Sequence, residues 1–245
     1  MTNAYLQYII ISDVQNILKE EFKMKITVFN GSPSGANSAT NKIASAFLCG
    51  AQNAGADTYN IFLSEKNIAQ CGGCFTCWFK TPGKCVCNDD MEELLKLYCT
   101  SNAVVFATPV YTWNMTALMK NFVDRLAPLK SPKITVKNGD CDLVDAKPKN
   151  QKYIVISNCG FPGVNNFEVM KAVFSCCEPS LEIYRNCGKL LKSRGSAAEK
   201  VREYLDAVKQ AGFEFARTLD VSEKTRKQLE MQLMSTDEYV RYLGM

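Results

Sequence analysis

The chain contains no histidine among its 245 residues. Without an imidazole it cannot build a Ser-His-Asp or Cys-His nucleophilic system, or any metal site that requires a histidine ligand. It also lacks an apolar run near the roughly 20 residues of a membrane span. Its N-terminal stretch lacks the basic start and apolar segment of a secretory signal. Proton transfer must therefore come from Tyr, Lys, Asp, Glu, Cys, water or a cofactor.

Charge of one sign is not in excess, because 29 basic and 25 acidic residues leave a net charge of +4. No basic run is interleaved with aromatic residues, so we expect neither nucleic acid nor a membrane as a partner. Hydrophobic residues make up 47% of the chain, which is enough to bury the core of a large α/β domain. We expect a cytoplasmic protein, because neither a secretory signal nor a membrane span is apparent.

Cysteines, by contrast, are abundant, with twelve in the chain. In a reducing compartment, closely spaced cysteines are more often metal ligands or redox groups than structural disulfides. Cys71, Cys74, Cys77 and Cys85 follow the pattern C-x2-C-x2-C-x7-C, and Cys87 lies two residues further on. Three thiolates at this spacing can turn toward one point, and a fourth in a short loop can complete the set. The pattern is typical of iron–sulfur ligation.

The cysteine run has other interpretations that the residues leave open. Four thiolates also suit zinc, two could form a redox disulfide, and the loop could hold no metal. Cys87 competes with Cys85 for the fourth position. Gly72 and Gly73 would let the loop wrap a cluster, but they would equally allow a plain turn.

Strands and helices are predicted to alternate along the chain. Short β-branched and aromatic runs predict strands at residues 25–31, 58–63, 103–110, 153–160 and 181–187. Apolar residues at helical spacing predict helices at about residues 43–54, 89–99, 115–126, 165–178 and 196–218. This alternation predicts an α/β fold with a doubly wound, five-stranded parallel sheet in the order 2-1-3-4-5.

The remaining segments complete the expected domain organisation. Residues 128–150 contain three prolines and a turn-like Lys-Asn-Gly-Asp, so we expect a loop or excursion there. Capping boxes are predicted at Asp89 with Glu92 and at Ser235 with Glu238. We expect an N-terminal extension over 1–23, one domain over 24–218 and a C-terminal helical extension over 219–245.

The loop after the first predicted strand is rich in hydroxyl groups. Ligands of such sheets bind at the carboxyl ends of the strands, and hydroxyls with backbone N–H groups at a helix start suit a phosphate. The residues are Ser32, Ser34, Asn37, Ser38, Ala39 and Thr40. The loop has no Lys or Arg and is not a GxxxxGK[ST] motif, so a nucleoside triphosphate with magnesium is not expected. A serine-rich helix cap is the alternative.

Two further loops follow strands and carry candidate binding residues. The loop after the third strand contains Pro109, Val110, Tyr111, Thr112, Trp113 and Asn114. Its two aromatic side chains could flank a planar ring or could simply cap the core. The loop after the fourth strand contains Asn158, Cys159, Gly160 and Phe161. Its glycine allows a ligand to approach the backbone, although an ordinary turn is the alternative.

Taken in order, these loops resemble the flavodoxin-like NAD(P)H-dependent FMN reductases over roughly residues 24–218. VFNGSPSGANSAT resembles the phosphate-loop signature of that family, and ATPVYTWNMTALMKNFVDR resembles its flavin-ring signature. The resemblance implies that Pro109 to Asn114 and Asn158 to Phe161 line the flavin ring. It also implies that the FMN phosphate is held by Ser32, Ser34, Asn37, Ser38, Ala39 and Thr40. Ser34 departs from the family, because many relatives carry arginine there, and its charge would be missing from the phosphate site.

The cysteine run resembles that of the iron–sulfur flavoproteins, a branch of the same family. The resemblance implies a 4Fe–4S cluster held by Cys71, Cys74, Cys77 and Cys85. It also implies a homodimer or homotetramer in which the cluster lies near a neighbouring subunit's flavin.

The predicted activity is therefore that of an FMN-dependent oxidoreductase. Electrons would come from NADH, NADPH or a ferredoxin-type protein donor, and would pass to a small acceptor such as a quinone, a nitro compound or free flavin. No catalytic acid is assigned, and Tyr111 is the nearest candidate. The alternatives are a non-enzymatic flavodoxin-like electron carrier, which the net charge of +4 disfavours, and a metal-stabilised binding module, which would be colourless.

Overall fold

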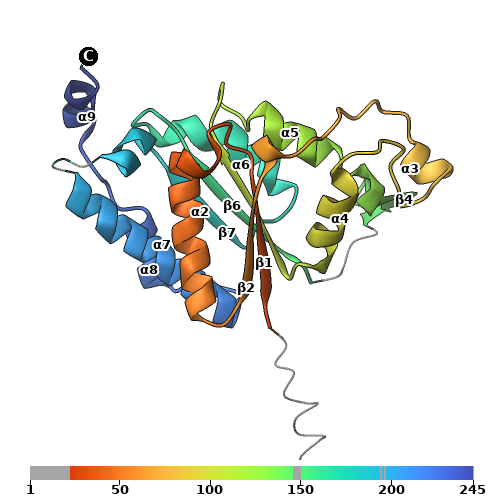
Figure 1. Ribbon diagram of the computed structural model, residues 1–245, viewed down its shortest axis with the longest axis horizontal. Helices are drawn as coiled ribbons and strands as arrows, with labels where there is room; N and C mark the ends of the chain where they lie inside the picture. Colours follow the sequence, from red (N-terminus) through yellow and green to blue (C-terminus); the bar gives the residue numbers. More distant parts are fainter. Residues whose placement is uncertain (1–22, 146–149, 194, 196, 245) are drawn as a thin grey trace, which may run out of the picture.

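The computed structural model describes residues 23–145, 150–193, 195 and 197–244 (Figure 1). The predicted N-terminal extension therefore lies outside the described residues, apart from Lys23. No helix in the described stretches is long and apolar enough to cross a membrane.

A five-stranded parallel sheet forms the centre of the molecule. Its strands lie in the order β2-β1-β3-β6-β7, and every neighbouring pair is parallel. Their bounds are β1 Lys25–Asn30, β2 Asp57–Phe62, β3 Ala103–Pro109, β6 Lys152–Asn158 and β7 Leu181–Arg185. Counted along the chain, these strands have the order 2-1-3-4-5, so the predicted fold class and topology are confirmed.

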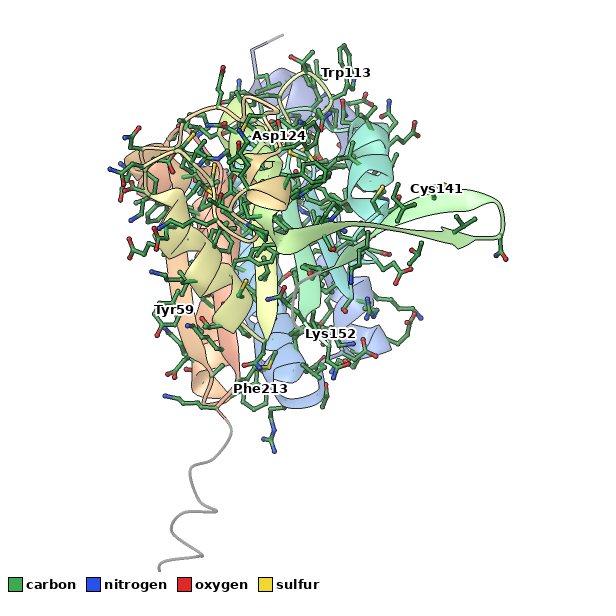
Figure 2. All side chains as sticks on the ribbon, turned by 90° about the vertical axis from the view of Figure 1, so that its right-hand side faces the viewer. Tyr59, Trp113, Asp124, Cys141, Lys152 and Phe213 are labelled. Atoms are coloured by element: carbon green, nitrogen blue, oxygen red, sulfur yellow. The ribbon has the colours of Figure 1, made fainter. Side chains whose placement is uncertain are left out.

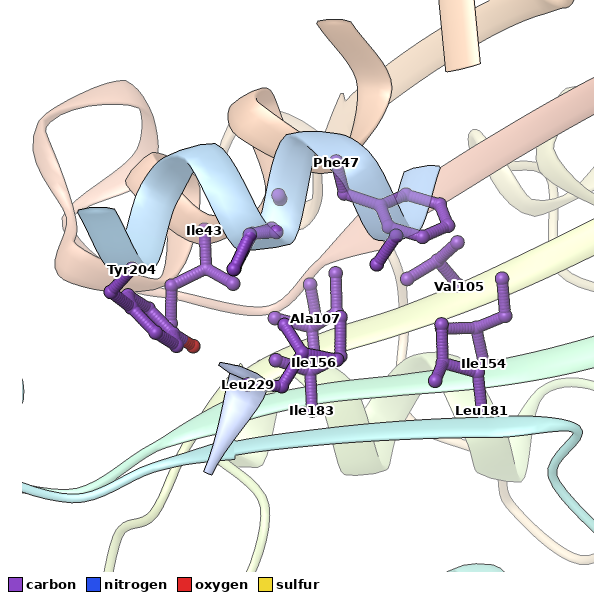
Figure 3. Packing of buried hydrophobic residues seen from close by; sticks show 14 of the residues in the cluster. Ile43, Phe47, Val105, Ala107, Ile154, Ile156, Leu181, Ile183, Tyr204 and Leu229 are labelled. Carbon is purple, nitrogen blue, oxygen red and sulfur yellow. The ribbon is translucent and has the colours of Figure 1, made fainter. Parts of the chain in front are cut away.

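Helices cover both faces of the sheet, as the alternation of strand residues requires. On β3, Val105 and Ala107 pack toward α2 (Ala39–Asn53) and α7 (Ala198–Thr218), as Figure 3 shows. Val104 and Phe106 belong to the opposite core, under α4, α5 and α6. These helices span Met91–Thr100, Ala117–Asp124 and Glu168–Ser175. Short helical turns lie at Gly35–Asn37, Leu63–Glu65, Thr76–Phe79 (α3), Ala127–Leu129, Val164–Phe167 and Gly188–Lys192.

Helices α2 and α7 pack very closely because a glycine lies at the contact on each side. A Cβ atom on Gly50 would lie 1.7 Å from Lys209 O, and one on Gly212 would lie 1.9 Å from Phe47 O. No side chain larger than hydrogen fits at either position without moving a helix. Helix α2, whose N-terminus ends the predicted phosphate loop, is therefore held firmly against α7.

The C-terminal helices α8 (Glu223–Leu229) and α9 (Thr236–Tyr242) pack onto the same core as α2 and α7. Arg185 holds this segment against β7, because its guanidinium donates to the carbonyl oxygens of Leu229 and Met231 at 2.7 Å each. The predicted capping box of Ser235 and Glu238 is confirmed at the start of α9.

Two local predictions are corrected. Residues 130–145 form an antiparallel hairpin, β4 (Lys130–Lys137) and β5 (Asp140–Asp145), which projects from the body in Figure 2. Asn138 and Gly139 adopt left-handed φ values of 55° and 87°, as the tight turn requires. The predicted capping box of Asp89 and Glu92 is wrong, because α4 starts after Asp90 without a side-chain cap. The Asp89 carboxylate is engaged by other partners.

Candidate functional site

Three predicted binding loops meet at the carboxyl edge of the sheet. Thr40 Oγ1, at the start of α2, donates to Asn158 Oδ1 at the end of β6 over 2.6 Å. Val110 N donates to Asn158 O over 2.8 Å, and Thr116 Oγ1 donates to Gly31 O over 2.6 Å. These bonds connect the loops after β1, β3 and β6 into one unit. Thr116, which the sequence did not single out, also caps α5 by accepting from Met119 N.

The predicted phosphate loop presents a helix N-terminus with unpaired donors. Ser38 caps α2 because its Oγ accepts from Asn41 N at 2.9 Å and donates to Gly35 O at 2.7 Å. The backbone N–H groups of Ala39 and Thr40 have no acceptor among the described residues. Ser34 and Asn37 are exposed beside them, whereas Ser32 is buried. This arrangement suits an anion, even though the Ser38 and Thr40 hydroxyls already bond to protein atoms.

The loop after β3 is a tight turn that projects two aromatic side chains. Tyr111 and Asn114 exchange two backbone hydrogen bonds of 2.8 and 3.0 Å. Thr112 and Trp113 have left-handed φ values of 49° and 63°, which residues other than glycine seldom adopt. Tyr111 is 53% exposed and Trp113 is 60% exposed, and Figure 2 shows Trp113 at one end of the molecule. These aromatics therefore do not cap the core.

The loop after β6 combines a buried thiol with an exposed ring. Cys159 is buried, and its Sγ donates to Phe161 O at 3.2 Å, whereas Phe161 is 64% exposed. Gly160 O accepts a hydrogen bond of 2.7 Å from Tyr239 Oη on α9. Burial raises the pKa of Cys159, and burial together with Cys159 raises the pKa of the neighbouring Cys187 to about 11. Burial therefore disfavours the thiolate form of both side chains.

The five cysteines between β2 and α4 line a single small cavity of about 60 Å³. The other wall is formed by α5 and the turn that follows it, through Asp124, Arg125, Ala127 and Pro128. Cys71 and Cys74 are exposed, and Cys77, Cys85 and Cys87 are half-buried. As their side chains stand, no three Cys, Asp or Glu groups in the described part of the chain are arranged to hold one metal ion.

The thiols in this cavity influence one another's ionisation. Burial raises the pKa of Cys77, and the negative charges of Cys85, Cys74 and Cys71 raise it further. The pKa of Cys74 is lowered by hydrogen bonds from the side chain and backbone of Thr76. Partial burial raises the pKa of Cys87, and a hydrogen bond with Cys85 adds to the effect. Cys77 thus interacts with the other three predicted ligands, while Cys87 pairs with Cys85.

A buried ion pair closes the base of the cysteine loop. Arg125 donates from Nη1 and Nη2 to Asp89 Oδ2 and Oδ1 at 2.7 and 3.0 Å, and the two side chains are 1% and 3% exposed. Arg125 Nη1 also donates to Ala69 O at 2.6 Å, and Asp89 accepts from Ala69 N at 2.9 Å. Burial alone would raise the pKa of Asp89, but the bonds from Arg125, Ala69 and Met91 hold it below its usual value.

Two further contacts fix the loop to the body. Asp90 exchanges two hydrogen bonds with the backbone of Asn67, so both ends of the loop are joined. Trp78 Nε1 donates to Ala127 O at 2.7 Å, and this bond docks the middle of the loop onto the turn after α5. No sequence pattern predicted these contacts of Asp89, Arg125 and Trp78, since their partners are distant in the chain.

Comparison with known proteins identifies the family of this chain. A family model described as NADPH-dependent FMN reductase matches residues 24–147, about half of the chain. An iron–sulfur flavoprotein of Archaeoglobus fulgidus is 43% identical over 105 residues, 43% of this chain and 46% of that protein. An iron–sulfur flavoprotein of Methanosarcina thermophila is 33% identical over 115 residues, 47% of this chain and 59% of that protein. The chain thus spans about half the length of the curated relatives it matches.

A solved structure supports the fold. An FMN-dependent NADH-azoreductase from Bacillus anthracis, in complex with FMN, has a TM-score of 0.57 at 14% identity, covering 79% of this chain and 100% of that one. The chain therefore belongs to the NADPH-dependent FMN reductase family, and within that family it is similar to the iron–sulfur flavoproteins.

Proposed function

We propose that this chain is an FMN-dependent oxidoreductase. It takes electrons from NADH, NADPH or a ferredoxin-type protein donor and delivers them to a small acceptor such as a quinone, a nitro compound or free flavin. The observation that carries this proposal is the meeting of three loops at the carboxyl edge of the sheet, with unpaired N–H groups on one loop and exposed aromatic side chains on another. Family membership supports FMN as the cofactor.

The phosphate of FMN is assigned to the start of α2. The N–H groups of Ala39 and Thr40 would donate to it, assisted by Ser34 and Asn37 and by the positive end of the helix dipole. No Lys or Arg lies between Ser32 and Thr40, so backbone and hydroxyl donors must hold the phosphate without a formal positive charge.

The flavin ring is assigned to the Tyr111–Asn114 turn and the loop Asn158–Phe161, which are joined by the bond from Val110 N to Asn158 O. When bound, FMN supplies the hydride and electron transfer, and the protein binds, orients and shields it. The N–H groups of Thr112, Trp113, Gly160 and Phe161 have no acceptor among the described residues. They are therefore the donors that this chain offers to negative charge that develops on the ring.

We extend the proposal to a 4Fe–4S cluster held by Cys71, Cys74, Cys77 and Cys85. A set of thiols without histidine suits iron–sulfur or zinc ligation, and all four line one cavity. Cys85 is taken as the fourth ligand because the C-x2-C-x2-C-x7-C run resembles the cysteine motif of the iron–sulfur flavoproteins, and Cys87 is its alternative. Ligation would require side-chain rotation, and the loop glycines, including Gly73 at a φ of 63°, allow backbone adjustment.

A homodimer or homotetramer completes the proposal. Phe75, which lines the cysteine cavity, and Phe79 in the same loop are 51% and 71% exposed. Ile134 and Val136 on the projecting hairpin are 65% and 71% exposed. Two-stranded hairpins gain stability by packing against another surface. A second copy of the chain would provide such a surface, and sedimentation velocity would test this assembly. A monomer at micromolar concentration would contradict it.

The cofactor content is tested by purifying the protein without oxygen, recording its visible spectrum and measuring FMN, iron, sulfide and zinc. We expect about one FMN per chain with four iron and four sulfide, and no zinc. FMN without iron would leave the oxidoreductase and remove the cluster. A colourless protein would contradict the flavin itself.

A further inference from the structure

Arg125 has one buried hydrogen-bond donor that the protein does not use. Its terminal nitrogens are engaged by Asp89 and by Ala69 O. Its Nε atom is buried and has no partner among the described residues. A buried N–H group without an acceptor is unfavourable because it has lost its bond to water. Arginine offers five N–H groups in a rigid fork, and Nε is the one nitrogen of Arg125 whose N–H finds no partner in the described part of the chain, so it calls for an acceptor close to the guanidinium.

The surroundings of this guanidinium identify the class of acceptor. Arg125 lines the small cavity that contains all five cysteines of the loop. It also lines an adjoining cavity of about 330 Å³, which Cys85 and Cys87 share. Both cavities therefore offer sulfur beside Arg125, and the one carboxylate that lines each of them, Asp124 or Glu92, already pairs with a lysine. Metal-bound thiolates and sulfide carry negative charge and accept hydrogen bonds from N–H groups, which tune the metal group.

The ion pair with Asp89 does not account for the whole arrangement. The single charge of Asp89 balances that of Arg125, and two nitrogens suffice to join Asp89 to Ala69. Holding the ends of the cysteine loop together therefore uses only the two terminal nitrogens of the guanidinium. The unpartnered Nε–H of Arg125 is explained when an acceptor occupies the cysteine cavity.

We propose that Arg125 is a positioning residue of the thiolate site, whose Nε–H donates to a sulfur of the iron–sulfur group held by Cys71, Cys74, Cys77 and Cys85. This inference rests on the proposed function. Reduction adds one negative charge to the group, so an N–H donor and a positive charge stabilise the reduced form more than the oxidised form. Arg125 thereby raises the reduction potential while it holds the loop closed.

The test compares Arg125→Lys with two other variants in anaerobically purified holoprotein. Arg125→Lys keeps the positive charge but removes the planar fork and its Nε–H. Lys84→Met is the charge control. It removes a positive charge from the lining of the adjoining cavity, but on a side chain that is 70% exposed. Asp89→Asn weakens the ion pair with Arg125 and retains the guanidinium. The readouts are iron and FMN per chain, the cluster potential by redox titration with EPR, and the shift of Fe–S resonance Raman bands in deuterated water.

We expect Arg125→Lys to retain FMN, to have a lower cluster potential than the wild type and to lose the deuterium shift of the Raman bands. Lys84→Met should leave both readouts unchanged, and Asp89→Asn should retain the deuterium shift. An iron-loaded Arg125→Lys with unchanged potential and an unchanged deuterium shift would overturn this inference alone. A wild-type protein that contains FMN but no iron would overturn it together with the proposed cluster, and would leave the flavin assignment intact.

Discussion

Thr40 Oγ1 and Asn158 Oδ1 are 2.6 Å apart although 118 positions separate them in the chain. Both side chains are buried, and Gly188 packs against Asn158 so closely that a Cβ atom there would lie 2.6 Å from Asn158 Nδ2. The hydroxyl–amide bond therefore joins the loop assigned to the phosphate with the loop assigned to the ring. We therefore expect ligand binding at one of these loops to depend on the position of the other.

Replacement of Thr40 by Val should weaken this junction. Asn158 Oδ1 would lose its buried donor, which costs about 1–3 kcal/mol. Urea denaturation of the FMN-free protein should show this loss, and Thr40→Ser should restore most of it. Ser175→Ala, which removes an exposed hydroxyl bonded within its own helix, is the control and should stay within about 0.5 kcal/mol of wild type. Equal stability of Thr40→Val and wild type would contradict the role of the bond.

The exposed aromatics of the turn after β3 should affect binding rather than stability. Because Tyr111 and Trp113 are more than half exposed, their replacement by Ala should change the free energy of unfolding by at most about 0.5 kcal/mol. The free energy of FMN binding should become less favourable by about 1 kcal/mol or more for each ring contact that is lost. Isothermal titration of the FMN-free variants measures the effect. A large loss of stability with unchanged FMN affinity would show that the rings serve the fold.

Asp89 should make the stability of the protein depend on acid pH. Its pKa is lowered in the folded state, so the ionised carboxylate favours folding above its unfolded pKa of about 3.9. This contribution is lost as the pH falls through the lower folded value. Asp89→Asn removes it and leaves Arg125 buried without its counter-ion, at a cost of about 3–5 kcal/mol at pH 7. The difference in unfolding free energy from wild type should shrink below pH 4, and a constant difference would contradict this.

Gly50 should tolerate no side chain at the contact between α2 and α7. A methyl group there would lie 1.7 Å from Lys209 O, so Gly50→Ala should destabilise the protein by at least about 1–3 kcal/mol. Gly72→Ala is the matched control, since nothing lies within 4 Å of its added methyl group. Thermal unfolding monitored by circular dichroism compares the two. Similar melting temperatures for Gly50→Ala and wild type would be incompatible with the close packing of these helices.

The sequence predicted the sheet well because each strand is a short apolar run with local signals at its ends. AVVFATPV, apolar on both faces, forms β3 at the centre of the sheet. The hairpin at 130–145 was missed because its strands are polar and contain Pro132, and only Asn138-Gly139 marked its turn.

The candidate site was predictable in its positions but not in its contacts. Loop order placed residues 32–40, 109–114 and 158–161 at one edge, since parallel strands end together. The partners of individual side chains depend on tertiary packing, so no local pattern predicted that Asp89 pairs with Arg125 or that Tyr239 on α9 bonds to Gly160 O. The burial of the Cys159 side chain was also not apparent from its sequence neighbours.

The central claim is that FMN in this protein accepts electrons from a nicotinamide cofactor. The direct measurement is anaerobic mixing of the purified holoprotein with NADH or NADPH, followed by flavin absorbance. The account predicts that one of these donors bleaches the flavin without any partner protein. A bound flavin that neither NADH nor NADPH reduces, but that a protein reductase does, would contradict this claim and would favour the electron-carrier alternative.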